Sequence, residues 1–319
     1  MEALSGRTAA WPNFGALIAH GRRLCLQLAH RSWRQAPISL ARLLVRPLPD
    51  RTYLALGHLC YFGTWPNYAE PHTFNEHIQE YMLRCRDPLL RVAADKIMCR
   101  EYITARVGAM YLVPLLGVWD SAEAVPLDTL PLPFVLKPSA ASGLVLMLRA
   151  GDTRHPADLR RILRGWLRRD YSRLHREWCY AGLPRRIVGE TMLIDETSNC
   201  VPADYKAYVI GGAVRFFQVD RGRFTHHTRN IYGPKWETLP ARWTLQKHAP
   251  DPTPPQLAEM TAVAEELARP FEFLRIDYYI VDGKLYIGEL TNYPGAGFEK
   301  FIPSTYADVI GAFWKRAGE

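Results

Sequence analysis

The sequence lacks several features that would assign it to a broad protein class. No stretch reaches about 18 consecutive apolar residues, so no transmembrane helix is expected. The six cysteines form no CxxC pair and have no regular spacing, which favours free thiols in a reducing cytosol over disulfides or a zinc site. We therefore predict a cytoplasmic protein, with membrane association of its N-terminal segment as one option.

Two catalytic patterns are also missing. No glycine-rich turn joins a strand to a helix in the N-terminal part, so a dinucleotide-binding fold is not supported there. No Ser-His or Cys-His constellation is recognisable, which leaves no candidate for a nucleophilic side chain. The sequence thus favours chemistry that depends on positioned charges.

Lysine is scarce, because 8 lysines stand beside 32 arginines in a chain of net charge +8. Residues 1–50 hold seven arginines against Glu2 and Asp50, a balance of +5, and basic residues also crowd 154–186. These segments could attract phosphate polymers, acidic glycans or an anionic membrane surface, or they could be solvated helix faces. No RNA- or DNA-binding motif accompanies the charge, so we expect no nucleic acid partner.

The N-terminal part of the chain has a helical pattern. Residues 14–46 alternate apolar and basic residues, and Pro37 separates two helices. We predict that residues 1–50 form a basic helical extension with a peripheral membrane contact, and packing on the rest of the fold is the alternative. A helical subdomain, 51–130, follows, with helices over 53–65, 74–85 and 87–108 and a capping box of Thr73 and Glu76.

Short strands dominate residues 131–195. Lys137 ends a strand beside the flexible loop SAASG, where a lysine is well placed to reach a phosphate; a surface lysine is the alternative. The further elements expected here are a strand over 144–149, a basic helix over 156–178 and a strand over 185–193 that carries Glu190.

Residues 203–232 predict a hairpin that turns at Gly211-Gly212. Lys206 lies on its first strand, and Arg223 and Arg229 follow the second. His226 and His227 between the arginines do not predict a zinc site, because adjacent strand residues face opposite ways.

The most informative stretch is a second hairpin, FEFLRIDYYIVDGKLYIGELTNYPGAGFE (271–299), with its turn at Asp282-Gly283. Asp277 and Glu289 interrupt its apolar strands and can face each other across the hairpin. Buried carboxylates are costly unless they are paired or bind a cation, and Mg²⁺ usually takes one or two. Arg275 projects on the face of Asp277, which indicates phosphate chemistry; exposed acids on a solvated face are the alternative.

Together these segments resemble the ATP-grasp superfamily, most closely its TupA-like branch, over roughly residues 50–305. The most specific part is R-x-D, a hairpin, E-x-[N/T] and P-G, as at the metal-binding end of ligases such as D-alanine–D-alanine ligase. The segments that carry the resemblance are PHTFNEHI (71–78), DKIMCREYI (95–103), FVLKPSAASG (134–143), DYKAYVIGG (204–212), RFTHHTRN (223–230) and 274–301.

The resemblance implies an α+β ATP-grasp fold in which two α+β subdomains clasp ATP, with a helical N-terminal extension. Residues 131–195 would form the lid subdomain, and 196–319 the C-terminal subdomain with the metal site. The phosphate loop departs from the branch, because SAASG has no histidine before Ser142-Gly143. The helical N-terminal part also differs from the α/β subdomain of many ATP-grasp enzymes.

The resemblance also implies roles for individual residues. Mg²⁺ would be held by Asp277, Glu289 and Thr291, the last standing where most ATP-grasp enzymes have asparagine. Arg275 would stabilise charge on the transferring phosphoryl group. The remaining assignments are Lys96 and Lys137 to the ATP phosphates, Ser142-Gly143 to the loop over them, Glu190 to the adenine and ribose hinge, Lys206 to ATP binding, and Arg223 and Arg229 to the substrate carboxylate or acyl phosphate.

We accordingly predict an ATP-dependent carboxylate–amine ligase that works through an acyl phosphate. It would join an amino acid to a uronic acid, a peptide or another small carboxylate in polysaccharide or secondary-metabolite biosynthesis. The alternatives are a small-molecule kinase with the same phosphate site, a glycosyltransferase of a polysaccharide gene cluster, and a non-catalytic ATP-binding or membrane-associated scaffold.

Overall fold

The computed structural model describes residues 47–195, 200–223 and 225–317. The chain divides after Asn67 into two compact units, each taken here by itself. The described part of the first contains the helix α3 (Asp50–Phe62), which ends on Gly63 in a left-handed conformation. The two helices and the membrane contact predicted for the basic extension fall on residues up to 46 and lie outside the described residues. Within the described ranges, no helix combines the length and the apolar character that crossing a membrane requires.

The second unit begins with the helix α4 (Phe74–Arg84), whose first turn has the expected capping box. The Thr73 hydroxyl accepts a hydrogen bond from the Glu76 backbone N–H at 3.1 Å, and Glu76 Oε2 accepts from the Thr73 backbone N–H at 3.0 Å. Two orphan donors of the helix start are thereby satisfied. The capping box predicted from the sequence is confirmed.

The single helix predicted over 87–108 is wrong, because the chain breaks at Asp95 into α5 (Leu89–Ala94) and α6 (Met98–Arg106). Asp95 has an extended backbone, and its Oδ1 accepts from the backbone N–H groups of Ile97 at 2.8 Å and Met98 at 3.0 Å. An aspartate that bonds the backbone ahead of it competes with helix continuation. The break places Lys96 outside both helices.

A four-stranded antiparallel sheet follows the short 3-10 helix η1 (Ala109–Tyr111), and its strands are ordered β1-β4-β2-β3. The helix α7 (Pro156–Arg168) covers this sheet with Leu159, Leu163 and Trp166, which join one buried core with Phe134 and Leu136. The strands are β1 (Leu115–Trp119), β2 (Phe134–Pro138), β3 (Leu146–Leu148) and β4 (Ile187–Thr191).

The basic helix predicted over 156–178 is shorter than expected, since α7 ends at Arg168. Arg169 has an extended backbone, and the Asp170 carboxylate accepts from the backbone N–H and the hydroxyl of Ser172. This local turn competes with a continued helix. The short helices α8 (Ser172–His175) and η2 (Trp178–Tyr180) follow it.

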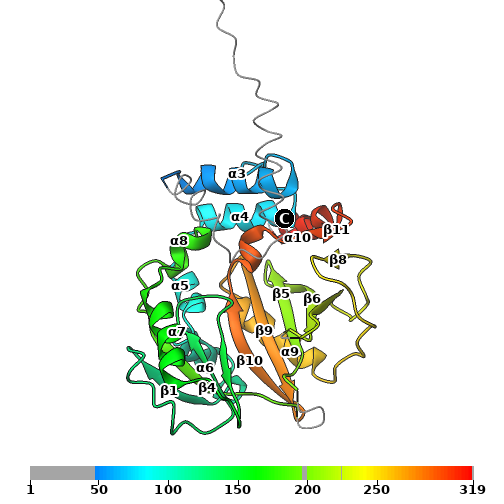
Figure 1. The fold of residues 1–319 in the computed structure, drawn as a ribbon. Helices are drawn as coiled ribbons and strands as arrows, with labels where there is room; N and C mark the ends of the chain where they lie inside the picture. The colour runs from blue at the N-terminus through cyan, green and yellow to red at the C-terminus, as the bar shows by residue number, and fades with distance from the viewer. Residues whose placement is uncertain (1–46, 196–199, 224, 318–319) are drawn as a thin grey trace, which may run out of the picture. The chain divides into compact units, whose positions relative to one another are not determined.

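The larger sheet has five antiparallel strands in the order β10-β9-β5-β6-β7, with α9 (Leu257–Ala268) packed against it (Figure 1). Both predicted hairpins are confirmed. Gly211 and Gly212 turn with φ of 58° and 76°, and Asp282 and Gly283 with 51° and 72°, as a two-residue hairpin loop requires. The strands are β5 (Asp204–Ile210), β6 (Ala213–Arg221), β7 (Thr228–Tyr232), β9 (Phe273–Val281) and β10 (Lys284–Thr291).

The chain after β10 is held by α4. The amide of Asn75 donates to the carbonyls of Gly297 at 3.0 Å and Glu299 at 2.8 Å, and the amide of Gln79 donates to Gly297 at 3.2 Å. Phe74 packs edge-on against Phe301 and Trp314 of the same part of the chain. The last elements are η3 (Pro294–Gly297), the two-stranded sheet of β8 (Arg242–Trp243) and β11 (Phe301–Ile302), and α10 (Tyr306–Ala317).

Helices and separate antiparallel sheets confirm the α+β class. The four-stranded sheet begins with β1, upstream of residue 131. The domain boundaries at 50, 130 and 195 stay predictions.

Candidate active site

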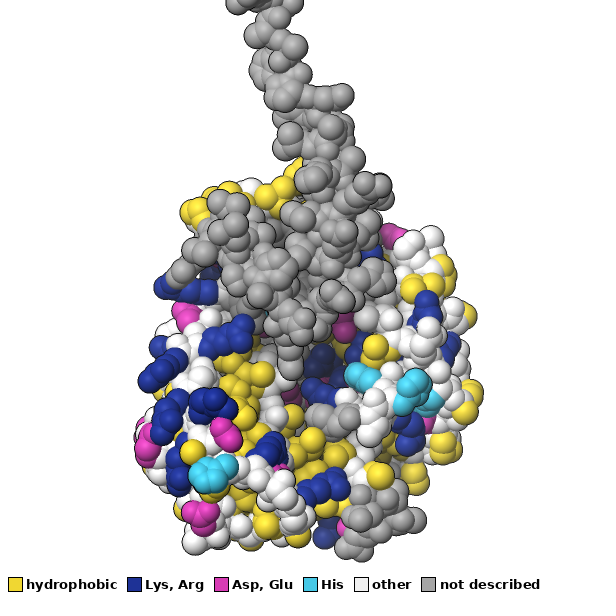
Figure 2. All heavy atoms as spheres, in the orientation of Figure 1, with side chains coloured by type: hydrophobic (Ala, Val, Ile, Leu, Met, Phe, Trp, Pro, Cys, Tyr) yellow, Lys and Arg dark blue, Asp and Glu magenta, His cyan; other side chains and the backbone are white. Residues whose placement is uncertain are grey.

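A cleft open to solvent, of about 810 Å³, is lined by both larger sheets. Lysine and arginine side chains gather at the bottom of a hollow in the face shown in Figure 2. Apolar side chains from β2, β3 and the segments beside them form much of the lining. Of the predicted site residues, the cleft is lined by Lys96, Lys137, Gly143, Glu190, Arg223, Asp277 and Glu289.

The hairpin β9–β10 brings its two acids together as expected, because Glu289 is the register partner of Asp277. The register shifts by one residue between Ile287 and Glu289, which makes Gly288 part of a bulge. A Cβ on Gly288 would lie 2.6 Å from the Tyr279 ring, so the bulge needs glycine there. Bulges commonly re-aim side chains beside active sites, and this one places Glu289 opposite Asp277.

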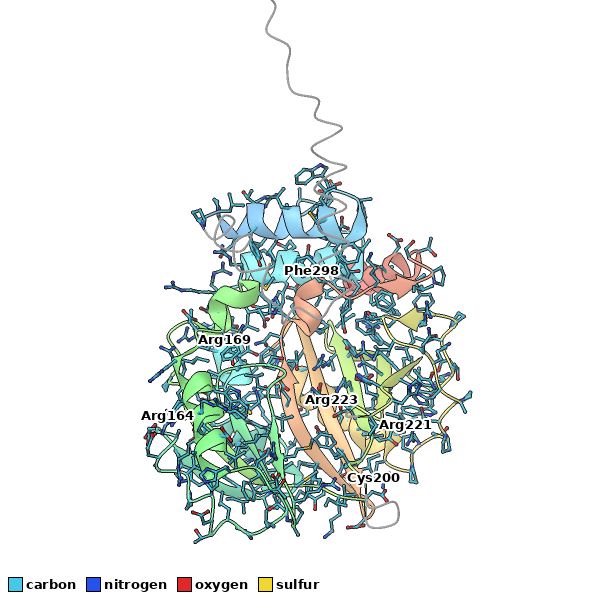
Figure 3. The ribbon with its side chains drawn as sticks, in the orientation of Figure 1. Arg164, Arg169, Cys200, Arg221, Arg223 and Phe298 are labelled. Atoms are coloured by element: carbon cyan, nitrogen blue, oxygen red, sulfur yellow. The ribbon has the colours of Figure 1, made fainter. Side chains whose placement is uncertain are left out.

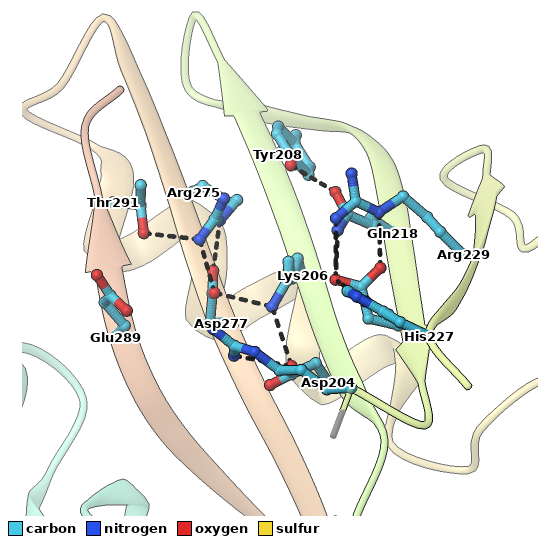
Figure 4. Close-up of polar contacts among 12 residues, drawn as sticks. Asp204, Lys206, Tyr208, Gln218, His227, Arg229, Arg275, Asp277, Glu289 and Thr291 are labelled. Carbon is cyan, nitrogen blue, oxygen red and sulfur yellow. Dashed lines mark hydrogen bonds and ion pairs between the residues drawn. The ribbon is translucent and has the colours of Figure 1, made fainter. Parts of the chain in front are cut away.

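Asp277 is the most heavily paired acid of the cleft (Figure 4). Arg275 donates from Nε to Asp277 Oδ1 at 2.6 Å and from Nη2 to Oδ2 at 2.7 Å, and Lys206 donates to Oδ2 at 3.0 Å. Burial alone would raise the pKa of Asp277, but the Arg275 and Lys206 cations hold it below its usual value. Asp277 is therefore a fixed anion with two cations around it.

Two further predicted residues meet this group. The Thr291 hydroxyl accepts from Arg275 Nη2 at 3.0 Å. Arg223, which lies beside β5 and β9 in Figure 3, donates to Asp204 Oδ2 at 3.1 Å. Asp204 also lies 3.6 Å from the Lys206 ammonium and is 4% exposed. Sequence reasoning gave Asp204 no role, although its place two residues before Lys206 on one strand face was a usable signal.

The two predicted phosphate-binding lysines are held differently. The Lys96 ammonium donates to the Ala141 carbonyl at 2.5 Å and lies 3.9 Å from Glu289 Oε1. The Lys137 ammonium donates to Glu190 Oε2 at 2.7 Å. Burial works against the Lys137 cation, but the Glu190 carboxylate outweighs it, so the pKa of Lys137 lies above its ordinary value. Lys137 therefore stays charged at neutral pH.

The loop after β2 meets the cleft through Gly143, which has a φ of 74°. Ser142 is exposed and lies outside the cleft lining. The assignments of Ser142, of Gly143 and of Glu190 as a hinge residue stay predictions.

Arg229 is placed apart from the cleft lining, in a buried ion-pair group. Its guanidinium donates to Asp220 at 2.7 and 3.2 Å and to Glu299 at 3.0 Å, and the residue is 7% exposed. Although Arg229 lies on an edge strand, its side chain is therefore buried rather than solvated. Its role toward a substrate stays a prediction.

The donor set fits Mg²⁺ in its chemistry. Asp277 and Glu289 supply two facing carboxylates, and the Thr291 hydroxyl lies on the same strand as Glu289. No group of three or more His, Cys, Asp or Glu side chains that could hold a metal ion occurs among the described residues. A cation here would depend on two carboxylates and on phosphate or water oxygens, which is the usual mode for Mg²⁺.

Glu177, at the start of η2, is a further acid near Glu289 that the sequence did not single out. Burial and then repulsion from Glu289 raise the pKa of Glu177 from 4.5 to about 8. The folded protein thus holds a proton that the unfolded chain releases near pH 4.5. A raised carboxyl pKa makes stability fall as pH rises through the window from 4.5 to about 8.

Replacing Glu177 with glutamine should therefore raise the thermal unfolding midpoint relative to wild type at about pH 9 and change it little at about pH 5. Thermal unfolding at several pH values between these limits measures the effect. The matched control is Glu101→Gln on the exposed side of α6. An equal shift of Glu177→Gln at both pH values would contradict the assigned ionisation.

Comparison with known proteins gives one family match. The protein-family model described as TupA-like ATPgrasp matches residues 76–315. No curated protein sequence matches the chain.

Several solved structures resemble the chain at low sequence identity. D-alanine–D-alanine ligase from Bacillus anthracis, complexed with ATP, is 15% identical over 64% of this chain and 56% of its own, with a TM-score of 0.40. L-amino acid ligase from Bacillus licheniformis is 15% identical over 73% and 50%, with a TM-score of 0.43. N5-carboxyaminoimidazole ribonucleotide synthetase from Thermus thermophilus is 13% identical over 68% and 51%, with a TM-score of 0.40. The chain spans about half the length of these structures.

Proposed function

Because the chain belongs to the TupA-like ATP-grasp family, we propose that it is an ATP-dependent carboxylate–amine ligase. The observation that carries the proposal is the cleft itself. Three cations, Lys96, Lys137 and Arg223, line it together with the facing carboxylates Asp277 and Glu289 and with apolar walls. A polyphosphate needs such cations, a nucleobase needs apolar walls, and a metal bound to phosphate needs the carboxylates.

In this proposal the four-stranded sheet and the loop after β2 bind the nucleotide. Lys96 and Lys137 both line the cleft next to the loop 139–143, and both would contact phosphate oxygens. Glu190 accepts from the Lys137 ammonium at 2.7 Å, which orients the ammonium toward the cleft before ATP arrives. Fixed cations lower the barrier because little reorganisation remains at the moment of reaction.

Asp277, Glu289 and the Thr291 hydroxyl would hold Mg²⁺, which supplies Lewis-acid polarisation of the phosphoryl oxygens when bound. The chain's own residues set the charge around it. Arg275 is oriented by its two bonds to Asp277 and by the third to Thr291, and it would stabilise charge on the transferring phosphoryl group. Lys206 neutralises Asp277 from the neighbouring strand.

The reaction proposed has two steps. A substrate carboxylate oxygen attacks the γ-phosphorus, the bond to the β–γ bridging oxygen breaks, and ADP and an acyl phosphate result. An amine then attacks the acyl carbon, loses a proton, and displaces inorganic phosphate to leave an amide. Both steps need positioning and charge stabilisation rather than a nucleophilic side chain.

For the substrates, we propose an amino acid as the amine and a uronic acid, a peptide or another small carboxylate as the acceptor. Arg223 is the candidate for binding the carboxylate, because it lines the cleft with a side chain that is 42% exposed. A contact of residues 1–50 with a membrane surface remains part of the proposal.

The test is a screen of carboxylate and amine pairs for phosphate release from ATP, with the carboxylate oxygens labelled by oxygen-18. A ligase acting through an acyl phosphate requires both co-substrates and transfers one labelled oxygen to the released phosphate. ADP formation from a single hydroxyl acceptor, without label transfer, would establish the kinase instead. Failure of wild type to bind ATP in a calorimetric titration with Mg²⁺ would overturn the nucleotide site altogether.

A further inference from the structure

Arg100 of α6 lies behind the cleft and reaches two residues that line it. Its Nη1 donates to Glu190 Oε1 at 3.0 Å, and its Nη2 donates to the Val113 carbonyl at 2.9 Å. Arg100 itself does not line the cleft. Its guanidinium therefore acts on the site only through groups that it holds.

Glu190 is shared between two cations. Oε1 accepts from Arg100 and Oε2 accepts from Lys137, so each carboxylate oxygen has its own donor. The Glu190 side chain is 8% exposed, and those of Arg100 and Lys137 are 16% exposed. In such an enclosed group, charges are screened far less than at the surface.

The charge balance of this triad decides what Lys137 can do. One carboxylate and two cations leave a net charge of +1. Of the two cations, Lys137 lines the cleft and Arg100 does not. Without Arg100, the whole Glu190 charge would fall on Lys137 and the group would be neutral. A neutral ion pair attracts a phosphate much less than an ammonium whose counter-ion is already shared.

We propose that Arg100 is a positioning residue for Lys137: by holding one oxygen of Glu190, it leaves the Lys137 ammonium free to exchange a bond to Glu190 for one to an ATP phosphate. This role rests on the proposed nucleotide site. It gives Arg100 an effect on ATP binding without contact with ATP.

The test compares Arg100→Gln with the double variant Arg100→Gln/Glu190→Gln by calorimetric titration of ATP with Mg²⁺. Arg100→Gln should weaken ATP binding roughly tenfold, within the range of coupling between neighbouring charges. The double variant should bind ATP more tightly than the single variant, because the neutral glutamine at position 190 no longer captures Lys137. A merely structural role predicts the reverse, since a second lost contact would weaken binding further.

The matched control is Arg106→Gln in the last turn of the same helix. Arg106 pairs with Glu266 at 3.3 Å and lies outside the cleft lining, so its loss should leave ATP affinity unchanged. If Arg100→Gln does not fold, Arg100→Lys keeps the charge without the two-pronged geometry. The affinity of that variant for ATP should be lower than that of wild type but still measurable.

A second measurement does not need ATP. Acylation of Lys137 by an amine-reactive reagent, followed by mass spectrometry over pH, reports the fraction of neutral amine. Loss of Arg100 removes a nearby cation, so the pKa of Lys137 should rise and its acylation at a given pH should slow. Unchanged Lys137 reactivity in Arg100→Gln would overturn the inference even where ATP binding is normal. Failure of wild type to bind ATP, with slowed Lys137 acylation in the variant, would overturn the proposed function and leave the charge coupling in place.

Discussion

Replacement of Asp277 with asparagine is expected to weaken the binding of ATP with Mg²⁺ at least about tenfold and to reduce turnover by about 10²–10³-fold. Asparagine keeps the shape and removes the charge that orients Arg275 and Lys206 and that would hold the cation. Calorimetry over a range of Mg²⁺ concentrations should show that the Mg²⁺ dependence of ATP binding is lost. Wild-type affinity in this variant would remove Asp277 from the metal site.

The matched control lies in the same hairpin. Asp282→Asn makes the same chemical change in the exposed turn, where asparagine tolerates the left-handed φ of 51°. ATP binding should be unchanged there. Because Asp277 is buried between two cations, its variant must also be checked by thermal unfolding. Glu289→Gln provides a second test with less structural cost, since the ion pair of Glu289 among the described residues is the long one to Lys96 at 3.9 Å.

Replacement of Arg229 with glutamine is expected to lower the free energy of unfolding by about 3–5 kcal/mol. The loss leaves Asp220, which is 4% exposed, as a buried anion whose remaining partners include Gln218 at 2.8 Å. Urea unfolding measures the effect. The surface control is Arg84→Gln, which breaks ion pairs with Glu80 and Glu272 and should cost no more than about 1 kcal/mol.

The pH dependence of the Arg229 variant gives a sharper test. In wild type, burial works to raise the pKa of Asp220, but His227 and Arg229 hold this pKa well below its usual value. The ionised Asp220 therefore contributes its full share to the stability of the folded protein at every pH above the usual pKa of an aspartate. Without Arg229, the buried Asp220 should take up a proton more readily than the unfolded chain does. The stability gap between wild type and variant should narrow from about pH 7 to about pH 5. A gap that is constant over this range would contradict an uncompensated Asp220 charge.

The sequence predicted the hairpin β9–β10 well because its determinants are local. The Asp282-Gly283 turn sets the register near the loop, but that register alone would pair Asp277 with Gly288. The bulge at Gly288, which the sequence did not predict, places Glu289 opposite Asp277 instead. The Thr73–Glu76 capping box and the Gly211-Gly212 turn are equally short-range features. In each case, neighbouring residues decide the backbone conformation.

The sequence did not predict the pairing of Arg100 with Glu190, because the two are 90 positions apart and no pattern links them. The burial of Arg229 was missed for a related reason. β7 is an edge strand, and an arginine there is usually solvated, but the segment that follows covers it. The Arg229 backbone N–H donates to the Gln246 carbonyl, and Asn230 bonds to His248 and Ala249.

The hydrogen bonds between α4 and the chain after β10 affect how the protein folds during its synthesis. Asn75 and Gln79 find their acceptors at Gly297 and Glu299, 218 to 224 positions later. During synthesis, α4 leaves the ribosome long before these carbonyls exist, and the hairpin with Asp277 and Glu289 is also made well after α4. Contacts of such high sequence separation slow folding and leave apolar surface uncovered meanwhile. α4 therefore has to wait for these acceptors until the hairpin that carries the candidate metal site has been made.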